Sequence, residues 1–378
     1  AELEDFLSTT SPGEEIKLEV KRPSGDTSQS LTFTVTLDER PLELIRPESD
    51  LGTRPVPSFL TGIHSIGNEE ARFDDLELQG IASLRTSHWQ VEENETENGK
   101  EVVFRKTVSV SDESDSARLE FVKRYQLART PGDQSLNHDF PGYHLVMKVE
   151  IWNRGTSEED VAYRIDGPNG LPLEGWWYSY KTHPSWGSAG ARDVIWRVNG
   201  NKASLRSPSQ IHKELDEEKE ELNPAIPLLA DRPSLEDRTL DYLGIDTQYF
   251  SAVMLAGEAK TPGTIVCQQA YSVPLGDAKS LDGKKIRTMN TTFRMVSDRA
   301  TIQPGESVSH EYHLFLGPKS TNLLKEYGIS GIIEYGWFSF VARPLSRLLH
   351  FFYRITWNYG LAIILLTVLV RGCMFPVG

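Results

Sequence analysis

The segments ARLEFVKRYQL (residues 117–127) and HLVMKVEIW (residues 144–152) carry a strong β-strand pattern and set the fold class of this chain. Both are rich in β-branched and aromatic residues, which favour strands, and both are bounded by residues that favour turns. Comparable segments recur from about residue 73 to residue 317 without an intervening helical period. Many strands at short spacing indicate a mainly β, antiparallel sandwich and argue against a fold that alternates strands with helices.

Further strands are predicted on both sides of these two segments. Upstream, alternating residues predict strands at 16–21 and 31–37, and the prolines that follow break the next stretch into loops. The other predicted strands are 101–110, 161–166, 194–198, 249–256, 264–271, 291–296 and 308–316. The charged run IHKELDEEKEEL (residues 211–222) is interpreted as a solvated loop or short surface helix, and residues 214–221 within it are an alternative candidate as a docking surface.

Charge is distributed unevenly along the 378 residues, whose net charge is −14. From residue 321 onward there are five basic and two acidic residues, so this part carries +3 and residues 1–320 carry the remaining −17. The acidic body would repel phosphates, which argues against a nucleic-acid partner. An acidic body joined to a basic, apolar tail is typical of a membrane-tethered domain. Because the first ten residues are acidic and polar, we expect any export signal to lie upstream of Ala1.

Residues that commonly carry chemistry form no recognisable motif. No phosphate-binding loop, nucleophile elbow or metal-ligand spacing is visible, so we expect no metal, no cofactor and no enzymatic activity. His310 and His313 lie three residues apart on one predicted strand and therefore point to opposite faces. The two cysteines, Cys267 and Cys373, are far apart in the sequence, and we expect no structural disulfide between them.

A helical pattern covers residues 344–357, where Pro344 suits the first helical position because the amide that proline lacks would be unpaired there. At about 100° per residue, the side chains that share one apolar face are Val341, Leu345, Leu348, Leu349, Phe352 and Ile355. The side chains that gather on the opposite, basic face are Arg343, Arg347, His350 and Arg354. This pattern is typical of a helix lying in a membrane interface, and the alternative is a surface helix that covers a soluble core.

An apolar run follows at residues 359–370, with Trp357 and Tyr359 at its entrance as in an aromatic belt. At ~1.5 Å per residue, 357–378 is long enough to span a membrane, and the alternative is a buried core helix. Arg371 interrupts the run, and an arginine in the hydrocarbon region is unfavourable by ~2.5–3.5 kcal/mol. Arg371 would then either face a polar cavity that attracts substrate or reach the headgroups as a topological anchor.

The tail contains four short motifs, which are YGWF (335–338), ARPL (342–345), NYGLAII (358–364) and VRGCMFP (370–376). In their order and spacing these motifs resemble the YidC family of membrane protein insertases. Weaker similarity is found in QYF (248–250) and LGPK (316–319) of the body. The resemblance implies a large periplasmic supersandwich, similar to mutarotases, followed by an amphipathic interfacial helix and a transmembrane helix.

The resemblance also implies a division of the chain and a function. The expected parts are an amino-terminal β/loop extension (1–60), an extracytoplasmic β-sandwich (61–319), a linker with a short helix (320–336), an interfacial helix (337–356) and the start of a transmembrane helix (357–378). Arg371 corresponds to an arginine in a water-filled groove of the family, which receives polar parts of inserting proteins. The implied partners are nascent membrane proteins, the lipid bilayer, the secretion channel and accessory export components, at the bacterial inner membrane.

Two other function classes remain open from the residues alone. The first is a carbohydrate-binding or mutarotase-like enzyme, in which Trp176, Trp177 and Tyr178 form a ligand cleft and Glu174 and His183 supply acid–base chemistry. The competing interpretation is that this Gly/Pro-rich connection buries its aromatic side chains in the sandwich. The second class is a membrane-anchored interaction module that docks other export components.

Overall fold

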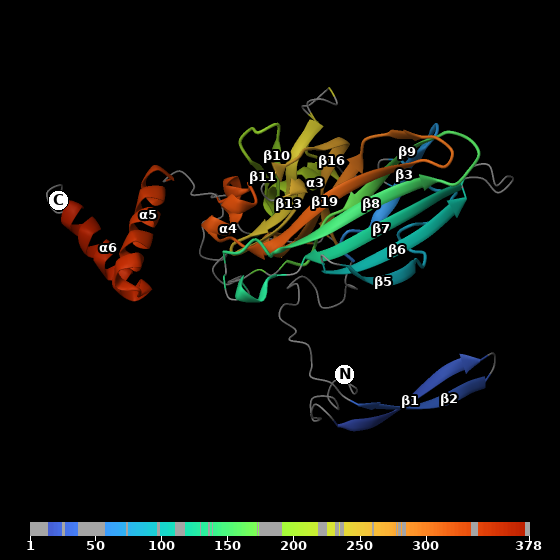
Figure 1. The fold of residues 1–378 in the computed structure, drawn as a ribbon, viewed down its shortest axis with the longest axis horizontal. Helices are drawn as coiled ribbons and strands as arrows, with labels where there is room; N and C mark the ends of the chain where they lie inside the picture. Colours follow the sequence, from blue (N-terminus) through green and yellow to red (C-terminus); the bar gives the residue numbers. More distant parts are fainter. Residues whose placement is uncertain are drawn as a thin grey trace. The chain divides into compact units, whose positions relative to one another are not determined.

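The computed structural model describes residues 14–374 apart from a set of short gaps. These gaps are 25–26, 37–56, 73–74, 97–98, 110–117, 129, 135–136, 138, 172, 174–190, 218–224, 231–233, 235–237, 259–260, 277, 279–280, 282–284 and 334–338. The chain divides into two compact units, Ala1–Arg46 and Pro47–Gly378. Strands dominate the described residues (Figure 1), so the prediction of a mainly β, antiparallel fold is confirmed.

The first unit contains one antiparallel hairpin, β1 (Glu15–Ser24) and β2 (Thr27–Thr36). In its register Ile16 lies opposite Val35, and Leu18 lies opposite Phe33. Successive side chains of a strand point to opposite faces, so these apolar residues share one face of the hairpin. Both strands were predicted from the alternation in the sequence.

The second unit is built on two layers of antiparallel strands (Figure 1). The strands of the larger layer, in spatial order, are β5 (Gln90–Thr96), β6 (Gly99–Ser109), β7 (Arg118–Ala128), β8 (His144–Asn153), β19 (Ser307–Pro318), β14 (Phe250–Glu258), β13 (Thr239–Thr247), β10 (Ala191–Val198) and β11 (Ser204–Arg206). The short strand β15 (Thr261–Pro262) pairs with the end of β14. Every pairing in this layer is antiparallel.

The smaller layer has β9 near its centre. Its strands, in spatial order, are β4 (Glu69–Glu70), β3 (Thr61–Ile66), β9 (Glu159–Asp166), β17 (Asn290–Ser297), β16 (Ile265–Leu275) and β12 (Ile226–Pro227), and β18 (Ala300–Ile302) pairs with the beginning of β9. A short pairing between β13 and β16 joins the two layers. The 3-10 turns η1 (Gly132–Gln134) and η4 (Lys285–Thr288) lie in connections.

The main hydrophobic core lies between the two layers. Tyr163 of β9 illustrates this, because its hydroxyl is 2.8 Å from the hydroxyl of Tyr312 on β19 in the other layer. Fully buried residues from both layers, such as Phe121 and Phe293, belong to the same cluster. Helix α3 (Pro208–Glu217) adds Ile211 and Leu215 to this core, so the start of the charged run is a helix packed on the sandwich. The rest of that run lies outside the described residues.

A second apolar cluster lies on the outer face of the larger layer. It is formed by α4 (Thr321–Glu326) and η5 (Ser330–Ile332), which we call the elbow (residues 321–333). Leu323 and Leu324 of α4 pack with Phe315 of β19, while the neighbouring Leu314 points into the main core. The central strands are therefore buried on both faces, and the elbow is a fixed part of the domain.

Two helices follow the elbow, α5 (Ser339–Thr356) and α6 (Tyr359–Met374). The helical prediction for both segments is confirmed, but α5 begins five residues before Pro344, so the placement of Pro344 at the first helical position was wrong. Pro344 lies inside the helix, where it removes one backbone hydrogen bond. Within the described residues, no helix combines the length and the apolar character that crossing a membrane requires.

Candidate functional site

The junction of α5 and α6 is a tight turn held by side-chain hydrogen bonds. Trp357 adopts a left-handed backbone conformation (φ 54°), which ends α5. The Thr356 hydroxyl donates to the carbonyl of Phe352 at 2.9 Å. Asn358 then caps α6, since its Oδ1 accepts from the amides of Gly360 (2.8 Å) and Leu361 (3.3 Å). In the sequence, Asn358 was noted only as part of a motif, and its capping role was missed.

The two helices contact each other through small and aromatic residues. The rings of Tyr353 and Tyr359 stack with centroids 3.9 Å apart and an interplanar angle of 14°. Ala362, one turn into α6, is fully buried. The residues at the expected helical spacing after Ala362, Leu366 and Val370, are half-buried. One side of α6 therefore faces α5, and its remaining sides are open.

The structure places the predicted residues of α5 on two separate faces. Leu345, Leu348, Leu349 and Phe352 are half-buried, whereas Arg347, His350 and Arg354 are exposed. Arg343 lies within the helix, but its side chain is outside the described residues. Two large apolar residues at the border of the basic face are strongly exposed, Phe351 (54%) and Ile355 (62%). The half-buried residues and the exposed basic residues give α5 an amphipathic pattern, whereas Val341 and Ile355, which were also predicted on the apolar face, are exposed.

Helix α6 exposes large apolar side chains around most of its circumference. Those at least half exposed are Leu361, Ile363, Ile364 and Val368, at 51–65%. Transferring one such side chain from water to apolar surroundings is favourable by ~1.5–3 kcal/mol. A helix that is apolar on all sides belongs in a protein core or a membrane, and within the described residues no core covers α6.

Arg371 lies in the last turn of α6 and is exposed. Thr367 precedes it by one helical turn and lies on the same side of the helix. The Thr367 hydroxyl donates to the carbonyl of Ile363 at 2.8 Å, so its polarity is satisfied within the helix. Arg371 and Thr367 together form a short polar strip on an otherwise apolar helix. Thr367 was missed in the sequence, where its four-residue spacing from Arg371 was the available signal.

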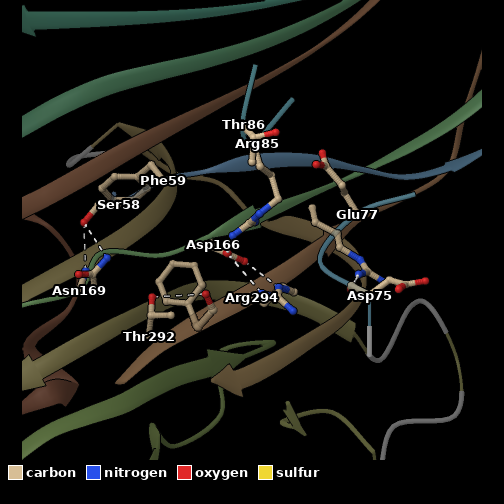
Figure 2. Close-up of polar contacts among 12 residues, drawn as sticks. Ser58, Phe59, Asp75, Glu77, Arg85, Thr86, Asp166, Asn169, Thr292 and Arg294 are labelled. Carbon is tan, nitrogen blue, oxygen red and sulfur yellow. Dashed lines mark hydrogen bonds and ion pairs between the residues drawn. The ribbon is translucent and has the colours of Figure 1, made fainter. Parts of the chain in front are cut away.

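A buried polar cluster lies on the outer face of the smaller layer, and Figure 2 shows its centre at Asp166. Arg294 of β17 holds this carboxylate with two contacts, Nε to Oδ1 at 2.7 Å and Nη2 to Oδ2 at 3.3 Å. Arg85 approaches from a loop, with Nη2 at 2.7 Å from Oδ2. Burial by itself raises the pKa of Asp166, but Arg294 and Arg85 outweigh it and hold that pKa below its usual range.

The same cluster fixes the loop that follows β4. Arg164 donates from Nε to Nδ1 of His64 at 3.0 Å, and its Nη2 reaches the carbonyl of Arg72 at 3.2 Å. Burial and the Arg164 charge lower the pKa of His64 to about 4, against the opposing effect of Glu70. Glu77 accepts from the amide of Leu84 at 3.0 Å and so closes the loop on itself. These contacts hold the loop against the sheet, so the residues that make them have a structural role.

The remaining sequence candidates separate into two groups. Trp176, Trp177 and Tyr178, together with Glu174 and His183, lie outside the described residues. His310 and His313 point to different neighbours, as expected: Nδ1 of His310 is 2.7 Å from the Tyr163 hydroxyl, and His313 stacks on His144 with centroids 5.6 Å apart. Among the described residues, no group of three or more His, Cys, Asp or Glu side chains is arranged to hold a metal ion.

Sequence comparison relates part of the chain to one family. Residues 206–348 match the family model of the YidC periplasmic domain. The chain is 44% identical over 94 residues to the membrane protein insertase YidC of Geotalea daltonii. It is 41% identical over 144 residues to that of Pelobacter propionicus, and 33% identical over 148 residues to that of Geobacter metallireducens. These matches cover 24%, 38% and 37% of this chain and only 18%, 23% and 26% of the three relatives.

Solved structures share only a distant likeness with the chain. A galactose mutarotase-like protein from Lactobacillus casei matches 68% of this chain and 84% of its own, with 9% identity and a TM-score of 0.39. A galactose 1-epimerase from Lactobacillus acidophilus matches 81% of this chain and 99% of its own, with 11% identity and a TM-score of 0.36.

Proposed function

Because this chain belongs to the YidC family, we propose that it is the part of a bacterial membrane protein insertase that joins a large periplasmic β-domain to the membrane. The observation that carries this proposal is the exposure of large apolar side chains on α6. In water this exposure is unfavourable, and in lipid the same side chains are buried. The name of the relatives, membrane protein insertase, agrees with that placement.

In this proposal the parts of the chain have different positions. The β-sandwich lies in the periplasm, α5 lies in the interface of the inner membrane, and α6 is the start of a transmembrane helix. The exposed Trp357, at 83%, and Tyr359 stand at the headgroup level, where amphipathic rings are favoured. The division into residues 1–60, 61–319, 320–336, 337–356 and 357–378 is proposed on the same basis.

Arg371 is proposed to be the residue that attracts polar segments of nascent membrane proteins. A guanidinium at the end of an apolar helix is tolerated where water or a polar partner reaches it. It would hold a hydrophilic segment by charge and hydrogen bonding, while apolar segments leave sideways into lipid. No covalent step, nucleotide or cofactor is needed, so we propose an insertase that is not an enzyme. The secretion channel and its accessory proteins are proposed partners.

The test replaces Arg371 in the insertase that contains this chain, expressed in cells depleted of their own insertase. We expect Arg371→Ala to lower the insertion of substrates with polar extracytoplasmic parts, measured by protease protection, and Arg371→Lys to retain most of it. Normal insertion of several such substrates by the alanine variant would leave Arg371 as a topological anchor and would contradict the proposed role.

A further inference from the structure

A groove of about 630 Å³ lies between one face of α5 and the elbow. The α5 wall carries Arg347, His350 and Arg354, and the elbow wall carries Thr321, Asn322 and Ser330. The described residues that line the groove include no acidic side chain. The groove is therefore cationic on one side and offers hydrogen-bonding groups on the other.

The cationic wall follows from helix spacing. Arg347, His350 and Arg354 are separated by three and four residues, so they form one row along α5. All three are exposed, and neither arginine is within ion-pair distance of a carboxylate in the described part of the chain. Planar guanidinium groups bind phosphate oxygens through paired hydrogen bonds, which makes such a row suited to a phosphate group.

The opposite wall is held in place by the domain. Leu323 and Leu324 anchor the elbow in the second apolar cluster. Nδ2 of Asn322 donates to Oδ2 of Asp139 at 3.0 Å, which fixes the orientation of its amide. The other carboxylate oxygen of Asp139 accepts from the Ser320 hydroxyl at 3.0 Å. Its charge is therefore engaged on the elbow.

Phe351 connects the groove to the apolar side of α5. It lines the groove and is 54% exposed, and Ile355, one turn further along, is 62% exposed. A ligand bound along this surface would contact the positive charges of Arg347 and Arg354 with one part and the apolar side chains of Phe351 and Ile355 with another. A free phosphate ion uses only the first of these, whereas a phospholipid uses both.

We propose that this groove binds the headgroup of an anionic phospholipid, with its phosphate at Arg347 and Arg354 and its acyl chains along Phe351 and Ile355. This inference rests on the proposed placement of α5 in the membrane interface and adds the class of lipid it selects. Attraction between a basic side chain and an anionic leaflet strengthens binding about fivefold for each arginine.

The test measures flotation of the full chain with vesicles of phosphatidylcholine alone and with vesicles that also contain phosphatidylglycerol. We expect phosphatidylglycerol to raise the fraction bound, and the double variant Arg347→Gln/Arg354→Gln to remove that increase, a loss of about 25-fold in the partition coefficient. The matched control is Lys325→Gln, which removes an exposed positive charge from α4 outside the groove. It should retain the full increase.

A neutral double variant tests the groove itself. Thr321→Val/Ser330→Ala changes only the elbow wall, at two exposed positions, and should lower the increase caused by phosphatidylglycerol without changing binding to phosphatidylcholine. An unchanged increase in this variant, an equal loss in Lys325→Gln, or full competition by inorganic phosphate would overturn the headgroup site. Binding that ignores phosphatidylglycerol would also overturn it while leaving the proposed function intact. Failure to bind any vesicle would contradict both.

Discussion

Asp166 and the two arginines that hold it show how strongly single residues act in the sandwich. The side chains of Asp166, Arg85 and Arg294 are only 10%, 9% and 4% exposed, so the negative charge of Asp166 is compensated by the two arginines and not by water. Removing one partner of such a buried group leaves an uncompensated charge in a medium of low dielectric constant.

We therefore expect Asp166→Asn to lower the free energy of unfolding by ~3–5 kcal/mol, measured by urea denaturation. The matched control is Glu92→Gln on the edge strand β5. Glu92 is 55% exposed and 3.7 Å from Arg105, so its loss should change stability by less than about 1 kcal/mol. Equal effects of the two substitutions would show that the Asp166 cluster contributes no more than a surface ion pair.

His64 makes the free energy of unfolding depend on pH. Its pKa is lowered from 6.5 to about 4 in the folded chain, so the unfolded chain binds more protons between these values. The neutral imidazole therefore stabilises the fold fully above pH 6.5, and this contribution is lost as the pH falls toward 4. We expect the change in unfolding free energy between pH 7 and pH 5 to be about 2 kcal/mol smaller in His64→Gln, measured by denaturation at both values.

Glutamine suits this experiment because it can accept from Arg164 and donate to Glu70 without titrating. If the unfolding free energy of the variant and of the natural chain changed by the same amount between pH 7 and pH 5, the pKa of His64 would not differ between the folded and unfolded states.

Among the elements, the strands were the easiest to predict from the sequence. Strands β6, β7, β8, β14, β16, β17 and β19 match predicted segments closely, because each combines β-branched or aromatic residues with a turn at its end. β3 (Thr61–Ile66), β5 (Gln90–Thr96) and β13 (Thr239–Thr247) were not predicted. The sequence of β5 is QVEENET, and most of its residues are exposed. Its composition does not favour a strand, so its extended conformation depends on pairing with β6.

The polar cluster around Asp166 could not be predicted, since it depends on pairing between distant segments. Arg294 and Asp166 are 128 residues apart in the sequence. They come into contact only because β17 pairs with β9. A partial signal was present, as Arg164 and Asp166 alternate with the core residues Tyr163 and Ile165 and so share the outer face. The helical candidates depended on local spacing, and for that reason the two faces of α5 were visible in the sequence.

The turn between α5 and α6 gives a prediction at this scale. We expect Asn358→Ala to weaken the first turn of α6 by ~0.5–2 kcal/mol, because the amides of Gly360 and Leu361 lose their side-chain acceptor. Hydrogen exchange of these two amides in lipid nanodiscs measures the change. Asn358→Asp keeps the acceptor and should exchange like the natural chain, and equally slow exchange in the alanine variant would contradict the capping role.

In the molecule as a whole, we propose that the residues after the elbow bind lipid and that the β-domain does not. The acidic body and the basic tail differ in charge, and the exposed apolar side chains of α6 have no cover among the described residues. The core of the sandwich and the elbow end before Ser339, so α5 and α6 contribute to neither apolar cluster.

The most direct test is flotation of the full chain with liposomes, compared with a variant that ends after residue 336. We expect the full chain to float with the liposomes and the shortened chain to remain at the bottom of the gradient, with its melting temperature unchanged. A full chain that stays monomeric and unbound in the presence of liposomes would show that α5 and α6 pack on their own domain, and would contradict the proposed membrane function.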